Sequence, residues 1–434
     1  MATPKILPEE FLHYVWENRL FYSESLTTTE GQSIEILQLG RRNVNSGPDF
    51  FNARIKIAET LWVGNVEIHK HSSDWEKHKH NNNKAFDNVI LHVVANHDKD
   101  VFRTNGEKIP VMEMHYPEIY RQNYQQLLEV KSGIPCEKQF FKVDLFQLQL
   151  GYNRLMIERL EQKTARILEQ LEKNNGDWNE TFYQNMARMF GFRVNSFSFE
   201  LLAKSLPVRI LGKHRDNLEQ IEALLFGNSG LLHDELLGDD YFMALRNEYS
   251  FLCKKYKLRG IQSHLWKFMR LRPGNFPTLR IAQFAALIHT SKGLLSKIIE
   301  LNDLKQLQKL FRVRASKYWD SHYVFNKPSN RKSVKELGEA SANALIINVV
   351  VPFLFVYGEK QNRIDLKDRA LEFLEKLPPE KNSIIANWKK MGIDIKSAFE
   401  SQALIQLKNL YCETKKCLNC HIGVKLVKSI PEEK

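Results

Sequence analysis

Hydrophobic and polar positions follow two different periods in the first 118 residues of this chain. Residues 8–21 carry apolar side chains at helical spacing, after which the alternation changes to the period of a half-buried strand. The strand-like segments are residues 33–40, 51–57, 61–69 and 88–94, with a proline-containing edge strand at 108–114. This order predicts a helix followed by a mixed sheet, so we expect an α/β domain over residues 1–118.

Beyond residue 145 the pattern changes to Leu, Ile and Met at spacings of three and four. This spacing predicts amphipathic helices, among them residues 148–174, 181–190 and 198–205. Residues 344–354 form an apolar stretch that we expect to be a buried helix interrupted or kinked by Pro352. The pattern indicates a linker at 119–144, a mainly α-helical, basic domain at 145–400 and a C-terminal cysteine-containing segment at 401–434.

Charge adds a candidate partner to this outline. The 434 residues carry a formal net charge of +12, which favours a polyanion such as DNA or RNA through counterion release. Arg270, Arg272 and Arg280 are the candidate phosphate contacts. No apolar run reaches the length of a membrane span and the N-terminus lacks the order of a secretory signal, so we expect a cytoplasmic protein without a membrane partner. The oligomeric state stays open.

Candidate chemistry is concentrated near the third predicted strand. Alternation places Asn65, Glu67 and His69 on one face of residues 61–69, and Asp49 stands where the preceding strand begins. Two carboxylates on neighbouring strands are suited to Mg²⁺ or Mn²⁺, which take one or two carboxylates plus water and substrate phosphate oxygens. His69 would then act as general base or phosphate stabiliser. A capped turn at Asp49 and a salt bridge at Glu67 are the alternative interpretation.

Pro48-Asp49 followed by Glu67-Ile68-His69 resembles the signature of the PD-(D/E)XK nuclease superfamily, over roughly residues 8–100. The resemblance implies a restriction-endonuclease-like mixed sheet and a metal-dependent nuclease or other phosphodiesterase acting on nucleic acid. His69 stands where the superfamily has a lysine, and Lys70 should face the opposite side of the strand. The alternative is therefore a catalytically inactive protein that binds nucleic acid or another partner and has a structural metal site.

Further histidines follow the same strand. His78 and His80 lie two residues apart downstream of Asp74 and Trp75, and we interpret them as a solvated loop, with a zinc site as the alternative. A third hypothesis for the protein, a metal-dependent hydrolase of a small substrate, would use these two residues and His69. His92, inside the apolar strand, is expected to be a hydrogen-bonded core histidine.

The five cysteines are odd in number and mostly late in the chain, which favours reduced thiols or a metal site over disulfides. Cys412, Cys417 and Cys420 are spaced closely enough for one turn to present three sulfurs to a soft metal. His421 would complete a zinc site, whereas Cys136 would complete a four-cysteine zinc or iron–sulfur site.

An N-terminal cysteine closing on a C-terminal trio resembles the iron–sulfur nucleases of CRISPR adaptation and of bacterial helicase–nuclease complexes. The chain as a whole also resembles an uncharacterised bacterial family that shares its GPDF, GNVEIH and C-terminal cysteine segments.

Overall fold

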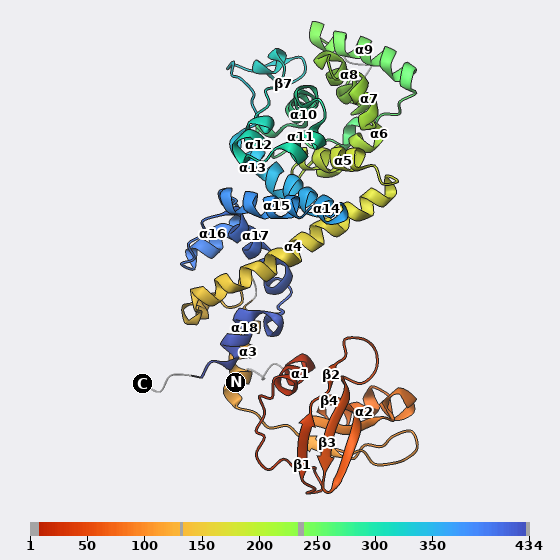
Figure 1. The fold of residues 1–434 in the computed structure, drawn as a ribbon, viewed down its shortest axis with the longest axis vertical. Helices are drawn as coiled ribbons and strands as arrows, with labels where there is room; N and C mark the ends of the chain where they lie inside the picture. The colour runs from red at the N-terminus through yellow and green to blue at the C-terminus, as the bar shows by residue number, and fades with distance from the viewer. Residues whose placement is uncertain (1–7, 131–132, 233–237, 431–434) are drawn as a thin grey trace. The chain divides into compact units, whose positions relative to one another are not determined.

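The computed structural model describes residues 8–130, 133–232 and 238–430, and divides them into two compact units (Figure 1). The first unit contains the chain up to Leu150 together with Lys408 onward, and the second contains Gly151–Leu407. The cysteine-containing C-terminal segment therefore folds with the α/β part of the chain. The predicted linker at 119–144 likewise belongs to the first unit, where α3 (Glu118–Glu129) and the 3-10 helix η3 (Glu137–Lys142) occupy most of it.

A mixed sheet forms the centre of the first unit. Its strands run in the order β1-β3-β4-β5-β6, with β2 paired to β3. β1, β2 and β4 are antiparallel to β3, whereas β5 is parallel to β4 and β6 is parallel to β5. The strands are β1 (Ile34–Gln38), β2 (Arg41–Arg42), β3 (Phe50–Ile57), β4 (Thr60–His71), β5 (Val89–Asn96) and β6 (Val111–Glu113).

The predicted mixed sheet is confirmed, and so are two finer features. β5 is buried along most of its length, as an apolar strand between β4 and β6 should be. β6 begins directly after Pro110 and lies at the edge of the sheet. Proline is tolerated there because an edge position does not need a backbone N–H for pairing on its outer side.

Two helical segments pack on this sheet. α1 (Glu9–Glu17) buries Phe11, Val15 and Trp16, and the Trp16 ring meets Phe50 edge-on with centroids 6.5 Å apart. α2 (Asp74–Lys77) contributes Trp75 to a separate apolar cluster with residues of β5 and the following loop. The buried apolar side chains fix the position of each helix on the sheet. The polar side chains of the same helix are thereby held close to the sheet.

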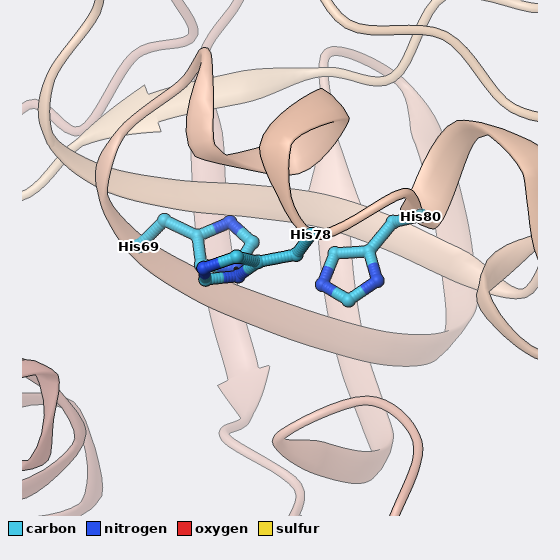
Figure 2. A group of neighbouring side chains, drawn as sticks. All are labelled: His69, His78 and His80. Atoms are coloured by element: carbon cyan, nitrogen blue, oxygen red, sulfur yellow. Dashed lines mark hydrogen bonds between the residues drawn. The ribbon is translucent and has the colours of Figure 1, made fainter.

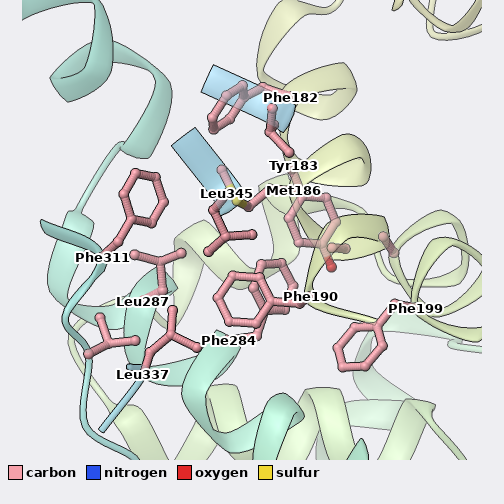
Figure 3. Packing of buried hydrophobic residues seen from close by; sticks show 14 of the residues in the cluster. Phe182, Tyr183, Met186, Phe190, Phe199, Phe284, Leu287, Phe311, Leu337 and Leu345 are labelled. Atoms are coloured by element: carbon pink, nitrogen blue, oxygen red, sulfur yellow. The ribbon is translucent and has the colours of Figure 1, made fainter. Parts of the chain in front are cut away.

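The second unit is helical and is built around one large apolar core (Figure 3). Phe190, Phe199 and Phe284 meet near its centre, with the Phe190 and Phe284 ring centroids 4.9 Å apart. Its longer helices are α4 (Leu145–Lys173, whose first turns belong to the first unit), α5 (Trp178–Phe190), α6 (Ser196–Ser205), α8 (Leu218–Asn228), α9 (Asp240–Tyr256), α10 (Pro277–Ser291), α14 (Val351–Lys360), α15 (Ile364–Lys376) and α17 (Ala398–Gln406). Shorter elements are α7 (Val208–Lys213), α11 (Leu294–Glu300), α12 (Leu304–Phe311), α13 (Glu339–Leu345), α16 (Ser383–Lys390) and the ribbon of β7 (His322–Val324) and β8 (Lys327–Pro328).

Pro352 disturbs its helix as predicted. The π-helical segment η7 (Ile346–Val350) joins α13 to α14 immediately before Pro352, so the missing N–H and the ring are accommodated by a wider turn. The combined stretch Glu339–Lys360 is the one described helix long and apolar enough to cross a membrane, and 67% of its most apolar window is buried inside the protein.

Candidate functional site

Asp49 and Glu67 lie side by side because β3 and β4 pair antiparallel. Phe50 is aligned with Val66, so the residue that precedes β3 stands beside the residue that follows Val66. The Asp49 N–H donates to Glu67 Oε2 at 3.0 Å, and the Ile68 N–H donates to Asp49 Oδ2 at 2.9 Å. Each carboxylate therefore uses one oxygen to hold the neighbouring strand.

His13 brings the helix α1 to this pair. Its Nε2 lies 3.2 Å from Asp49 Oδ2, the oxygen that already accepts from Ile68. The Asp49 side chain is 22% exposed, whereas that of Glu67 is 6% exposed. Because Asp49 Oδ2 and Glu67 Oε2 have backbone partners, Asp49 Oδ1 and Glu67 Oε1 are the oxygens left for another ligand.

Three histidines, His69, His78 and His80, lie together beside Glu67 (Figure 2 shows the three rings). His69 Nε2 lies 3.4 Å from Glu67 Oε1 and 3.1 Å from His78 Nδ1, while His80 Nε2 lies 3.2 Å from the same oxygen. One potential ligand nitrogen from each histidine can be chosen so that all lie within 4.8 Å of one another. In the part of the chain that the structure describes, no other set of three or more potential metal ligands is as compact.

The loop after β4 folds back so that His78 and His80 reach His69. The His78 N–H closes α2 on the carbonyl of Asp74, and Lys79 then adopts a left-handed conformation with φ of 62°. This reversal turns His80 toward the sheet, where its ring stacks on Phe86 with centroids 3.8 Å apart. His78 remains exposed and His80 is half-buried, so the interpretation of both as a solvated loop misses the approach of their rings to His69.

Burial controls the protonation of this pocket. Desolvation raises the pKa of Glu67, and the nearby Asp49 charge raises it further against the opposing effect of His80. Desolvation and then His92 and His78 lower the pKa of His69 to about 2. His69 is therefore neutral at physiological pH, which makes it a weak base and a poor stabiliser of phosphate charge but an available ligand.

His92 supports His69 from the neighbouring strand. The two residues come from paired strands, and His92 Nε2 lies 2.9 Å from His69 Nδ1. Burial also lowers the pKa of His92, to about 3, so the contact joins two neutral rings. His92 Nδ1 is buried without a hydrogen-bond partner, so the predicted core histidine is satisfied at only one of its nitrogens.

Four cysteines of the first unit, Cys136, Cys412, Cys417 and Cys420, lie near enough to raise one another's pKa, and we call this group the thiol pocket. Cys136 precedes η3, and Cys412 ends the π-helical segment η8 (Leu407–Cys412). Cys417 begins the short 3-10 helix η9 (Cys417–Asn419), and Cys420 follows it. All four are buried. Desolvation and then Cys420 and Cys417 raise the pKa of Cys136 to about 12, and Cys136 in turn raises that of Cys412. Cys136, in the second half of the predicted linker, thus joins the C-terminal trio.

The C-terminal helix holds the thiol segment in place. α18 (His421–Lys428) approaches so closely that a Cβ on Gly423 would lie 2.2 Å from the Cys417 carbonyl oxygen, which explains the glycine. Asn123 of α3 donates its Nδ2 to the carbonyls of Val427 and Ser429, at 3.2 and 2.8 Å. The turn that carries Cys417 and Cys420 is therefore held by contacts with α3 and α18. His421 is the first residue of α18.

The three candidate phosphate contacts differ in exposure. Arg270 and Arg272 are exposed on the loop before α10. Arg280 is 6% exposed inside the second unit, where it donates to Gln283 Oε1 and Asn275 Oδ1, and desolvation lowers its pKa to about 10. Its guanidinium is occupied by protein partners, so Arg270 and Arg272 are the members of the set available at the surface.

Comparison with protein-family models gives one match, over residues 9–383, to the family described as "Protein of unknown function (DUF2851)". The chain belongs to this family. The matched residues include Asp49, Glu67, the three histidines and Cys136, and they end before the C-terminal cysteine trio. Searches of curated proteins and of solved structures find no match.

Proposed function

We propose that this member of the family is a metal-dependent phosphodiesterase that acts on nucleic acid, with its reaction centre at Asp49 and Glu67. The supporting observation is the reciprocal hydrogen bonding of these two residues, which holds two carboxylates together at the start of β3 and the middle of β4. A helix followed by a mixed sheet with acids on neighbouring strands is the arrangement implied by the resemblance to restriction-endonuclease-like PD-(D/E)XK nucleases.

Asp49 Oδ1 and Glu67 Oε1 are the oxygens that would hold Mg²⁺ or Mn²⁺. When bound, such an ion polarises a phosphoryl oxygen and lowers the pKa of a coordinated water. The raised pKa of Glu67 fits a carboxyl that awaits a cation, because a positive charge would favour its ionised form. His13 lies beside Asp49, with its Nε2 3.2 Å from Asp49 Oδ2, and is the other histidine near this pair of carboxylates.

Nucleic acid is the expected substrate because of the net charge of +12. The positive net charge would attract nucleic acid through its phosphates, without selecting a base sequence. The exposed Arg270 and Arg272 are candidate phosphate contacts in the second unit.

The test is hydrolysis of single- and double-stranded DNA and RNA in the presence of Mg²⁺ or Mn²⁺. We expect Asp49→Ala and Glu67→Ala to slow hydrolysis by at least about 100-fold, since each removes a direct ligand. Glu59→Ala is the matched control, because Glu59 is an exposed acid in the hairpin between β3 and β4, where it pairs with Lys56. Equal hydrolysis by all four proteins, or none by the unchanged protein on any substrate, would refute the proposal.

A second candidate function is binding without cleavage. It is favoured by His69, which stands where the nuclease superfamily has a lysine and which carries no positive charge in its buried position. In that case the unchanged protein and Glu67→Ala would retain nucleic acid equally in a gel-shift assay, with no cleavage by either, and the thiol pocket would hold a structural metal.

A further inference from the structure

The donor atoms around His69 are spaced as ligands of one ion would be. His69 Nε2 is 3.1 Å from His78 Nδ1 and 3.4 Å from Glu67 Oε1, and the same oxygen is 3.2 Å from His80 Nε2. Zinc–nitrogen bonds of about 2.0–2.1 Å at tetrahedral angles place neighbouring ligands about 3.3 Å apart. Three of the separations in this pocket therefore already equal the edge of a zinc coordination tetrahedron.

The remaining separations can close without rearranging the sheet. Ligand nitrogens of all three histidines lie within 4.8 Å of one another, and His78 is exposed on the turn that ends α2. Rotation of this surface ring is enough to bring its nitrogen nearer to His80. His69 and Glu67 are on the rigid strand β4 and would provide the fixed half of the site.

Neighbouring groups orient the ligands in the way that outer-shell partners of metal sites do. His92 Nε2 contacts His69 Nδ1, which leaves His69 Nε2 directed at the other donors. Phe86 stacks on His80, and the Asp49 N–H occupies Glu67 Oε2 so that Oε1 faces the histidines. Glu67, His69 and His80 thus each have a second contact beside the pocket, whereas His78 is on the exposed turn.

The chemistry of the donors selects the class of ion. Three imidazole nitrogens and one carboxylate oxygen suit divalent first-row transition ions, whereas Mg²⁺ prefers oxygen ligands and retains its waters. In the ion-free protein the same atoms can share protons as hydrogen bonds, so the pocket forms without the ion. One ion would replace those shared protons.

We propose that Glu67, His69, His78 and His80 form a binding site for a single divalent transition ion of the Zn²⁺ class. The nitrogen donors distinguish this site from the pair of Asp49 and Glu67, with which it shares Glu67 Oε1. Ion binding here does not depend on the proposed phosphodiesterase activity. Glu67 contributes Oε1 to it while Oε2 remains bonded to the backbone of Asp49.

Cobalt(II) is a suitable probe, because its visible bands report tetrahedral coordination while thiolate ligands give a separate near-ultraviolet charge-transfer band. Full-length protein freed of metal by chelation is titrated with Co²⁺, and Zn²⁺ and Mg²⁺ are then added as competitors. We expect visible bands from a nitrogen and oxygen site that Zn²⁺ abolishes and Mg²⁺ leaves unchanged.

The double variant His78→Ala/His80→Ala should lose this signal, with affinity reduced by at least about 100-fold, more than the ~10–100-fold typical of a lost outer-shell partner. His71→Ala is the matched control, because His71 is an exposed histidine at the end of β4, and it should bind as the unchanged protein does. Glu67→Gln keeps the shape of the pocket and provides a second reading if the double variant folds poorly.

Unchanged affinity in both His78→Ala/His80→Ala and Glu67→Gln, or displacement of Co²⁺ by Mg²⁺ as readily as by Zn²⁺, would overturn this inference. Asp49→Ala separates it from the proposed function. That variant should retain the cobalt signal while losing phosphodiester hydrolysis, and the signal should persist even if the unchanged protein cleaves no nucleic acid.

Discussion

Donors of the same kind lie side by side in the first unit, whereas Glu222 and Lys163 of the second unit hydrogen-bond to groups of other kinds. Three imidazoles meet at Glu67 in one pocket of the first unit, and four thiols share another. In the second unit Glu222 accepts from the Tyr241 hydroxyl, and Lys163 donates to the amide oxygens of Asn348 and Gln402. These polar groups of the first unit thus have partners of their own kind, whereas those of the second unit have a hydroxyl or amide partner.

This comparison separates sites prepared for a cation from charges accommodated by the fold. Lone pairs gathered from like groups repel one another when deprotonated, so they are satisfied by protons or by a shared metal. A buried carboxyl whose hydrogen-bond partners are neutral changes its pKa instead, as for Glu222, whose pKa desolvation raises to about 7. We therefore expect any metal site of the protein to lie in the first unit.

The two pockets of the first unit also differ from each other. All four thiols are buried, whereas His78 and Asp49 keep the histidine pocket in contact with solvent. Structural zinc sites are closed and catalytic sites keep a position open to water or substrate. The thiol pocket is accordingly the candidate structural site, with zinc or an iron–sulfur cluster as its occupant.

The largest effect is expected from Cys417→Ser. If a metal joins the four thiols, loss of one ligand should lower the free energy of unfolding by at least about 4 kcal/mol, because the binding energy of structural zinc is folding energy. Cys253→Ser is the control, since Cys253 lies in α9 outside the pocket, and it should change stability by less than about 1 kcal/mol. Urea unfolding with and without a strong chelator measures both.

A metal content below one zinc or one iron per chain, together with equal urea midpoints for the two serine variants, would contradict the structural site. The comparison of the two units would then rest on the histidine pocket alone.

Glu222→Gln is expected to have the next largest effect, of opposite sign. Desolvation raises the pKa of Glu222 to about 7 from 4.5, so the folded state holds a proton that the unfolded state has already released between these values. Stability should therefore fall as pH rises from about 4.5 to 7 and stay lower above it. At pH 8 the neutral Gln should stabilise the protein by about 2–3 kcal/mol.

The measurement is urea unfolding at pH 5 and pH 8, with the exposed Glu300→Gln as control. A gain for Glu222→Gln that is the same at both pH values would show that ionisation of this carboxyl is not its cause.

The sequence predicts those parts of the site that depend on strand periodicity. Alternation along residues 61–69 brings Glu67 and His69 to one face of β4. The turn at Pro48 places Asp49 at the start of β3, the strand that precedes β4. Periodicity does not predict the return of His78 and His80, because this depends on a left-handed Lys79 and on Trp75 docking in an apolar cluster. The pair of histidines two residues apart, nine residues after His69, was the available signal.

Tertiary contacts decide the remaining features. Cys136 and the C-terminal trio are far apart in sequence, and the helices α3 and α18 bring their segments together. The burial of Arg280 follows from Phe192 under its guanidinium, at 4.5 Å from the ring centroid, and from the amides that accept its N–H groups. The number of basic residues near Arg280 in the sequence predicts neither the contact with Phe192 nor the hydrogen bonds to the amides.

Zinc should stabilise the unchanged protein more than His78→Ala/His80→Ala. An ion present at 100 times its dissociation constant adds about 2.7 kcal/mol to the free energy of unfolding, and the variant should lose up to this amount. The thiol pocket is present in both proteins, so its contribution cancels in the difference. Without zinc, His78→Ala alone should change stability by less than about 0.5 kcal/mol, because His78 is exposed.

Equal stabilisation of the unchanged protein and the double variant by zinc, measured by urea unfolding, would remove the distinction between a prepared histidine site and an ordinary polar loop.

The smallest effects are expected for Arg270→Ala and Arg272→Ala, which test whether the second unit is only a scaffold. Both side chains are exposed, so each change should leave stability within about 0.5 kcal/mol. If they contact phosphates, each should weaken nucleic-acid binding evenly across sequences and reduce the slope of log affinity against log salt by about 1. Lys396→Ala provides an exposed basic control, paired with Asp394 at 3.8 Å. If the slope of log affinity against log salt is unchanged in both arginine variants, this loop does not contact the phosphates of the nucleic acid. The second unit would then have only a structural role.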